Sequence, residues 1–151
     1  MLAGGSIFID QSRPDVESVG DWPLVRTESN GIHDQYNLVR IDDYLTDAFT
    51  EQSVEFIKHE HEKPFFLFLS HTTPHTPLQA TKKYTARYKH LKDPTARVYA
   101  AMVASLDDSV GAIVNTLSET KRLRDTLIVF SSDNGCACLL YTSDAADERN
   151  S

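Results

Sequence analysis

The chain has 151 residues, of which 40% are hydrophobic and 25% are charged, and its formal net charge is -7. This composition is ordinary for one soluble globular domain or for part of a larger one. The acidic balance, without a long run of Lys or Arg, argues against nucleic-acid binding, and no apolar stretch approaches the length of a membrane span.

Residues 1–43 are predicted to be rich in loops. Glycine and proline recur there, the apolar stretches are short, and a hairpin is expected around Leu38 to Ile41. The first residues (MLAGGSIFIDQSRP) lack the basic start and long apolar region of a signal peptide, and the compartment stays unknown. Cys136 and Cys138, separated by one residue, form neither a disulfide framework nor a paired zinc motif.

A helix is predicted from Tyr44 onward. Apolar residues recur there at helical spacing, Thr46 or Asp47 is expected to cap the helix, and it should end in the charged stretch before Pro64.

Two apolar runs, Phe65 to Leu69 and Leu127 to Phe130, are predicted to be strands buried on both faces of a parallel sheet. Between them, Thr95 to Thr120 carries an apolar stripe at three- and four-residue steps, typical of a long amphipathic helix. A right-handed crossover through this helix would place both strand ends at one edge of the sheet. The sequence therefore predicts an α/β fold with a mostly parallel sheet flanked by helices.

Residues able to carry chemistry follow both runs. His71 and His75 follow the first run, and Asp133 and Asn134 follow the second, at the sheet edge where ligands bind in α/β folds. Carboxylate and amide oxygens suit calcium or magnesium, and the His75 imidazole could bind an anion or protonate a leaving oxygen. The alternatives are a polar turn that closes a strand, an exposed loop histidine, and a His71 that bonds to nearby backbone.

Two further expectations lie outside this edge. The stretch from Thr72 to Asp93 is predicted to be a long surface loop with a helical turn near Tyr84 to Tyr88. Of the adjacent acids Asp107 and Asp108, the first borders the apolar stripe, so we expect it to be partly buried and hydrogen-bonded to a neighbouring loop.

Taken together, these segments resemble the sulfatase family, the arylsulfatase-like members of the alkaline-phosphatase-like superfamily. The resemblance covers about ninety consecutive residues, through YLTDAFTEQSVEFI, KPFFLFLSHTTPHTPLQ, ARVYAAMVASLDDSVGAIV and DTLIVFSSDNG. It implies that Asp133 and Asn134 help to hold a calcium ion (Ca2+). It also implies that His75 contacts the sulfate group, as both a substrate-binding and a catalytic residue.

The sequence departs from the family pattern in one essential part. The family's Cys-x-Pro/Ala-Ser-Arg segment, whose cysteine becomes the formylglycine nucleophile, does not occur here. The chain is therefore expected to be an internal fragment that is inactive by itself. Residues 1–43 would be a loop-rich part, and residues 44–137 the central to C-terminal part, of the catalytic domain. Residues 138–151 (CLLYTSDAADERNS) resemble a translated sequencing adapter and are expected to be non-native.

The function implied by the resemblance is the hydrolysis of sulfate esters of sugars or aryl alcohols. A phosphonate or phosphate monoester hydrolase of the same superfamily is the first alternative, because a metal and a histidine can serve either anion. A non-catalytic binding domain that keeps the fold is the second. By resemblance, the parent protein would be periplasmic, secreted or lysosomal.

Overall fold

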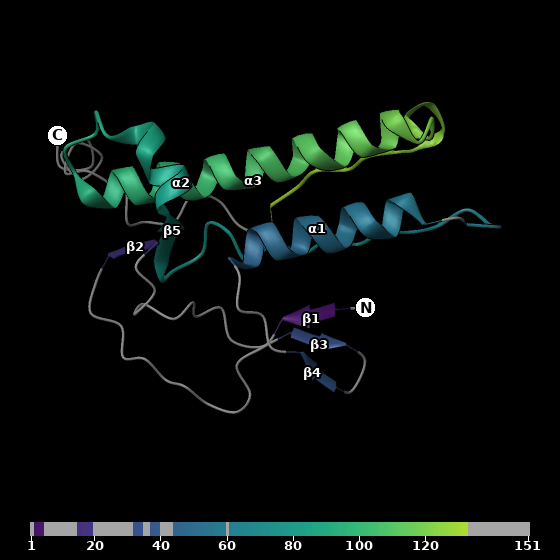
Figure 1. Cartoon of the computed structure of the whole chain (residues 1–151), viewed down its shortest axis with the longest axis horizontal. Coiled ribbons are helices and arrows are strands. Elements are labelled where there is room, and N and C mark those ends of the chain that lie inside the picture. Colours follow the sequence, from purple (N-terminus) through teal and green to yellow (C-terminus); the bar gives the residue numbers. More distant parts are fainter. Residues whose placement is uncertain are drawn as a thin grey trace, which may run out of the picture.

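The structure is a computed structural model that describes residues 2–4, 15–19, 32–34, 37–39, 44–59 and 61–132. Its two long helices are α1 (Leu45–Lys58) and α3 (Pro94–Glu119), and Figure 1 shows them side by side. The short helix α2 (Lys82–Thr85) and strand β5 (Leu78–Thr81) pack against α3, where β2 (Val16–Val19) joins them.

Helix α1 confirms the helix predicted from Tyr44, but its predicted cap is wrong. Neither Thr46 nor Asp47 caps the helix; Tyr44 is the N-cap residue, and its side chain makes no capping bond. The Tyr44 ring is buried instead, and its hydroxyl donates to the backbone carbonyl oxygen of Gln79 at 3.1 Å. A large apolar ring contributes more by burial than by capping, which explains the difference.

Helix α3 confirms the long predicted helix, and both of its ends are defined. The Asp93 carboxylate accepts hydrogen bonds from the backbone N–H groups of Thr95 (3.1 Å) and Ala96 (3.2 Å). At the other end, Lys121 adopts a left-handed conformation (φ 58°), and the Arg122 N–H donates to a carbonyl oxygen of the last turn. In the described part of the chain, no helix combines the length and apolarity that a membrane span needs.

The buried face of α3 differs from the predicted stripe. Val103, a stripe residue, is 42% exposed. Helix α3 buries Val98, Ala101, Met102, Ala104, Ser105, Ser109, Thr116 and Leu117, and most of these residues are small or hydroxyl-bearing. Small side chains let a neighbouring helix approach closely, so the packed face contains Met102 and Leu117 of the stripe together with small residues outside it.

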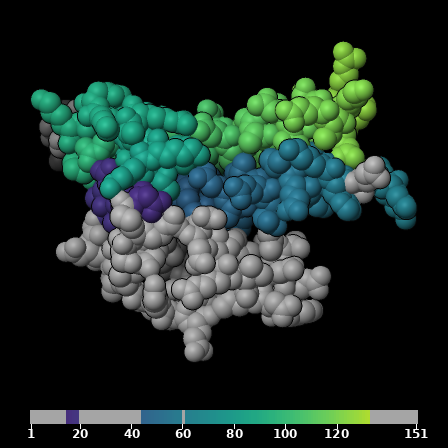
Figure 2. Space-filling model, viewed as in Figure 1, coloured from purple at the N-terminus to yellow at the C-terminus, as the bar shows by residue number. Residues whose placement is uncertain are grey.

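Helices α1 and α3 run parallel. The Tyr44 hydroxyl lies 3.4 Å from the Ser105 hydroxyl, and one turn further along the Thr50 hydroxyl lies 2.6 Å from that of Ser109. At the far ends, Arg122 donates to the Ile57 carbonyl oxygen. The space-filling view shows the two helices in contact, α3 in green above α1 in blue (Figure 2).

The hydrophobic core lies where α1, α3, α2 and β5 meet. It contains Tyr44, Leu78, Ala80, Tyr84, Val98, Ala101, Met102 and Ala104. The rings of Tyr44 and Tyr84 contact each other with centroids 6.0 Å apart. Through this core, the start of α1 packs against β5, α2 and the first half of α3.

The described strands form two small antiparallel sheets. Strand β3 (Ile32–Asp34) pairs with both β1 (Leu2–Gly4) and β4 (Asn37–Val39). The hairpin expected around Leu38 to Ile41 is thus formed by β3 and β4 and lies earlier in the chain than predicted. Strand β2 pairs with β5, with Val16 opposite Thr81 and Val19 opposite Leu78. The predicted mostly parallel sheet is therefore not confirmed.

Neither predicted parallel strand is a strand in the structure. Residues 65–69 and 127–130 are extended segments that run back along the helices (Figure 1). Their side chains are widely exposed: Phe66 88%, Phe68 70%, Leu127 88%, Val129 78% and Phe130 70%. A strand is defined by hydrogen bonds to a neighbouring strand, and these two segments pair with none of the described strands.

The loop predicted from Thr72 to Asp93 is wrong in part. Strand β5 lies within it, and all four of its residues are buried between β2 and α3. The helical turn expected near Tyr84 to Tyr88 is confirmed by α2 and by the 3-10 turn Ala86–Tyr88. The surrounding prolines and lysines concealed a four-residue strand, because so short a run carries little periodicity.

Candidate functional site

The His71–Pro77 loop lies beside the start of α1, and Thr72, Thr73 and His75 line a small cavity there together with Tyr44. The His75 side chain is exposed, and its backbone N–H donates to the Thr72 carbonyl oxygen at 2.9 Å. The His75 Nδ1 lies 2.6 Å from the Thr76 carbonyl oxygen, which can only accept, so Nδ1 carries the proton. The Nε2 atom is thus the free end of the ring, an acceptor when the ring is neutral and a donor when it is protonated.

Two side chains tie this loop to the long helices. The Thr73 hydroxyl lies 2.7 Å from the Thr46 hydroxyl of α1, and the His71 Nε2 lies 3.1 Å from the Ser109 hydroxyl of α3. The His71 ring also meets Phe49 edge-on, with centroids 6.1 Å apart. Desolvation by burial lowers the pKa of His71 below its usual 6.5. The expectation that His71 bonds to backbone is wrong, because a helix hydroxyl takes that place.

Two cavities adjoin the start of α1. The one beside His75 has a volume of about 20 Å3, which suits a single water molecule. A larger cavity of about 300 Å3 is lined by Asp15, Tyr44, Asp47, Glu51, Thr81, Lys82 and Lys83, and shares only Tyr44 with the first. The larger one contains no histidine, so we place the candidate site at the His75 loop, where a ligand can reach the ring from outside.

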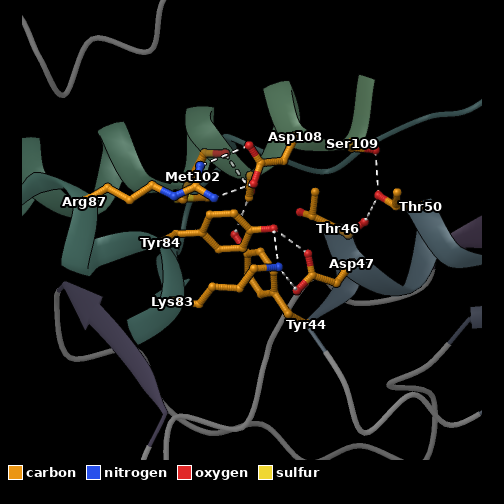
Figure 3. Close-up of polar contacts among 11 residues, drawn as sticks. Tyr44, Thr46, Asp47, Thr50, Lys83, Tyr84, Arg87, Met102, Asp108 and Ser109 are labelled. Atoms are coloured by element: carbon orange, nitrogen blue, oxygen red, sulfur yellow. Dashed lines mark hydrogen bonds and ion pairs between the residues drawn. The ribbon is translucent and has the colours of Figure 1, made fainter. Parts of the chain in front are cut away.

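A network of charged and aromatic side chains supports this end of the molecule. In Figure 3, the Tyr84 hydroxyl donates to the Asp47 carboxylate at 2.7 Å, and the Lys83 ammonium lies 3.8 Å from the same carboxylate. Lys83 and Arg87 also approach the Tyr84 ring, at 4.6 and 5.1 Å from its centroid. Burial and the Asp47 carboxylate raise the pKa of Tyr84, so its hydroxyl keeps its proton and donates it.

The helix acid that bonds to a neighbouring segment is Asp108, so the prediction for Asp107 is wrong. Asp107 is exposed, whereas both Asp108 oxygens accept from Arg87, at 3.0 and 2.6 Å (Figure 3). The Arg87 guanidinium holds the pKa of Asp108 below its usual value. Adjacent helical residues point about 100° apart, so the border of an apolar stripe does not fix which acid reaches a partner.

The other predicted site residues, Asp133 and Asn134, lie outside the described residues, as do Cys136 and Cys138. Their approach to His75 therefore stays a prediction, and so do the limits of the three segments and the nature of the tail. Within the described residues, no three His, Cys, Asp or Glu side chains cluster as metal ligands would. The sequence pointed to Thr46 only as a helix cap and did not single out Thr73 and Ser109, because single hydroxyl residues carry no motif.

Comparison with known families agrees with the quoted segments. The family model described as Sulfatase matches residues 8–144 of this chain. The chain belongs to the sulfatase family. Members of this family act on sulfate esters, and the family suggests a bound metal ion.

Individual relatives also align with most of this chain. The chain is 39% identical over 93 residues to human steryl-sulfatase, an alignment that covers 62% of this chain and 15% of that protein. It is 28% identical over 134 residues to pig N-acetylgalactosamine-6-sulfatase, covering 86% of this chain and 24% of the relative. The chain thus spans less than a quarter of either protein.

A solved structure also matches. The crystal structure of Ps i-CgsB in complex with k-i-k-neocarrahexaose aligns with a TM-score of 0.56 and 32% sequence identity, over 62% of this chain and 21% of that one. The structural neighbours are sulfatases, which have the alkaline-phosphatase-like fold.

Proposed function

We propose that this chain forms part of the catalytic domain of a sulfate ester hydrolase. In this proposal, His75 binds and polarises the sulfate group, while Asp133 and Asn134 supply oxygen ligands to a calcium ion. The observation that carries the proposal is the family match over residues 8–144, which contains all three residues in the order that the family implies.

The path of the chain supports the proposal that His75 lies near Asp133 and Asn134. Helices α1 and α3 are parallel, and each is followed by an extended segment that runs back along it (Figure 1). The first segment leads directly to the His71–Pro77 loop, and the second ends at Ser132, one residue before Asp133. In the complete domain, we propose that residues 65–69 and 127–130 are parallel strands of one sheet, with both polar ends at the same edge.

The His75 geometry suits an anion. Its Nδ1 proton is committed to the Thr76 carbonyl oxygen, so a protonated ring presents the Nε2–H outward. That N–H can donate to a sulfate oxygen, or to the ester oxygen as it leaves. Hydrolysis also needs a nucleophile, and the formylglycine that the resemblance implies would supply it from a segment that is not in this sequence.

The calcium proposal rests on donor chemistry. A carboxylate and an amide carbonyl at adjacent positions are hard oxygen ligands of the type that calcium takes, and calcium needs six to eight such ligands. Asp133 and Asn134 would therefore supply only part of the coordination sphere, and other parts of the domain would complete it. The substrate class is a sulfate ester of a sugar or an aryl alcohol.

The test uses a complete sulfatase domain that contains this chain, with an aryl sulfate and an aryl phosphate as substrates. His75→Ala should lower kcat about 100-fold or more on the sulfate, because a positioned acid contributes about 10²–10⁴-fold. Asp133→Ala should weaken calcium binding in a titration. His90→Ala, which changes an exposed loop histidine, is the matched control and should change neither quantity.

Two outcomes would contradict the proposal. Unchanged turnover in His75→Ala would remove His75 from the site. Faster hydrolysis of the phosphate than of the sulfate by the unaltered domain would replace the sulfatase with a phosphate monoester hydrolase.

A further inference from the structure

We propose that His71 is a positioning residue, which holds the His75-bearing loop in place through a hydrogen bond to Ser109, whose hydroxyl is in turn bonded to Thr50. The proposal rests on the proposed function, in which His75 acts on the sulfate group. It gives His71 a role other than the backbone contact that the sequence suggested, and the family comparison assigns no role to this residue.

The hydroxyl protons between α1 and α3 set the direction of this chain of hydrogen bonds. The Thr50 hydroxyl lies 2.6 Å from the Thr46 carbonyl oxygen and 2.6 Å from the Ser109 hydroxyl. Thr50 is the donor in both contacts, because the Thr46 carbonyl oxygen only accepts and Ser109 accepts from Thr50. The Ser109 hydroxyl therefore keeps its own proton for another partner.

The His71 ring completes this chain of hydrogen bonds. Its Nε2 lies 3.1 Å from the Ser109 hydroxyl, and whether the ring accepts or donates there depends on its tautomer. The Nδ1 is buried and has no hydrogen-bond partner among the described residues. A ring protonated on both nitrogens would put a charged, unpaired N–H in this position, so burial favours a neutral ring.

The His71–Ser109 bond affects the position of His75, because the hydrogen bonds of His75 itself lie within its own loop. Its backbone N–H and its Nδ1 both bond to carbonyl oxygens within the loop. The loop can therefore shift as a unit, taking His75 with it, unless other residues anchor it. His71 anchors it to α3 and, through Ser109, to α1, while Thr73 makes a separate bond to Thr46.

The experiment compares four variants in a complete sulfatase domain that contains this chain. His71→Leu keeps the bulk and removes the bond, Ser109→Ala removes its partner, and His71→Gln offers an amide, which can donate or accept, at a similar reach. Ser53→Ala is the matched control, because this buried α1 hydroxyl bonds to a carbonyl oxygen of its own helix at 2.7 Å.

We expect His71→Leu and Ser109→Ala each to lower kcat on an aryl sulfate about tenfold, with a smaller change in KM, since a misplaced group costs rate more than binding. The double variant should lose no more than either single one, because both remove the same bond. His71→Gln should recover most of the rate, and Ser53→Ala should match the parent.

Hydrogen exchange gives a readout that does not depend on activity. The amides of residues 72, 73, 75 and 76 should exchange faster in His71→Leu and Ser109→Ala, and at the parent rate in Ser53→Ala. If the unaltered domain hydrolyses no sulfate ester, or His75→Ala is fully active, the proposed function fails. The exchange rates would still show whether His71 holds the loop against α3.

Three results would overturn the positioning role. These are unchanged loop exchange in His71→Leu, a double variant whose two effects multiply, and loss of global stability without faster loop exchange than in the control.

Discussion

Two sides of the α1–α3 pair differ in how completely their apolar side chains are buried. One side is packed against other elements, and the extended segments 65–69 and 127–130 run along the other. On the packed side, α3 meets α1, α2 and β5 through small residues, and Val98 and Ala101 are both fully buried. Along the extended segments, Phe66 and Leu127 are both 88% exposed. Yet these segments are the most apolar stretches of the chain. Hydrophobicity alone therefore does not bury a segment; a complementary surface must also be present.

The difference follows from the range of the interactions. A helix satisfies its backbone hydrogen bonds within its own sequence, whereas a strand needs a neighbour for every bond. Helices α1 and α3 can form from local pattern and pair with each other. The extended segments would acquire ladder partners only from other strands of a complete domain, and their exposed apolar side chains mark where such strands would pack.

The largest expected effect comes from charging an extended segment. In a complete domain, Phe68→Lys should lower the free energy of unfolding by about 3–5 kcal/mol or prevent folding, because it removes a buried ring and buries a charge. In the 151-residue chain alone, the same change should raise the soluble yield, since Phe68 is 70% exposed there. Urea unfolding and soluble yield measure the two effects.

Glu62→Lys, an exposed position just before this segment, is the control and should change neither quantity markedly. A complete domain that tolerates Phe68→Lys would show that the segment stays uncovered there, and would refute the parallel-strand proposal.

The next effect tests the packed side. Ala101→Leu should lower the free energy of unfolding by about 1–3 kcal/mol, because Ala101 is fully buried and the helices leave no room for a larger side chain. Val103→Leu adds a methylene on the same helix at a position that is 42% exposed, and it should change stability by less than about 0.5 kcal/mol. Equal effects in urea unfolding would mean that the small residues do not set the helix spacing.

A smaller effect is expected from the polar network beside the core. Tyr84→Phe should cost about 1 kcal/mol in urea unfolding, because it removes the hydrogen bond from a buried hydroxyl to the Asp47 carboxylate. Tyr88→Phe, which changes a half-buried tyrosine next to the same core, is the control. If Tyr84→Phe lowers the free energy of unfolding no more than Tyr88→Phe does, the bond from Tyr84 to Asp47 does not stabilise the fold.

The smallest expected effect is a dependence on pH that arises from His71. Burial lowers its pKa in the folded state, so the unfolded chain takes up a proton first as the pH falls below about 6.5. The contribution to stability is complete above that pH and is lost as the pH falls toward the lower pKa of the folded state. Urea unfolding between pH 7.5 and about 5 should show this loss, and His71→Leu should flatten the curve. An unchanged slope would show that His71 is not desolvated.

The sequence predicted the helices better than the sheet, for a physical reason. The apolar stripe of Thr95 to Thr120 is a local signal, and the structure confirms the helix that it implies. The buried face of that helix could not be predicted, because the choice between Val103 and Ala104 depends on which neighbour packs there. Strand β5 was missed because four residues among prolines and lysines hold little periodic signal.

The candidate site was predictable only in part. His75 was found because prolines flank it after an apolar run, and the structure places it on an exposed loop. The residues that fix this loop come from α1 and α3, far apart in sequence, and contribute single hydroxyl groups. Such contacts arise from tertiary packing, which one sequence does not reveal.

Arg122 links the C-terminal ends of α1 and α3. Its guanidinium donates to the Ile57 carbonyl oxygen, and also to that of His59 at 3.4 Å, in the last turn of α1 and just beyond it. The two helix ends are thereby held at one level. The extended segments that follow run back along the helices, and each extended residue adds about 3.3 Å. Under the proposed function, this one side chain would therefore help to set the register in which the His75 loop and Asp133 approach each other.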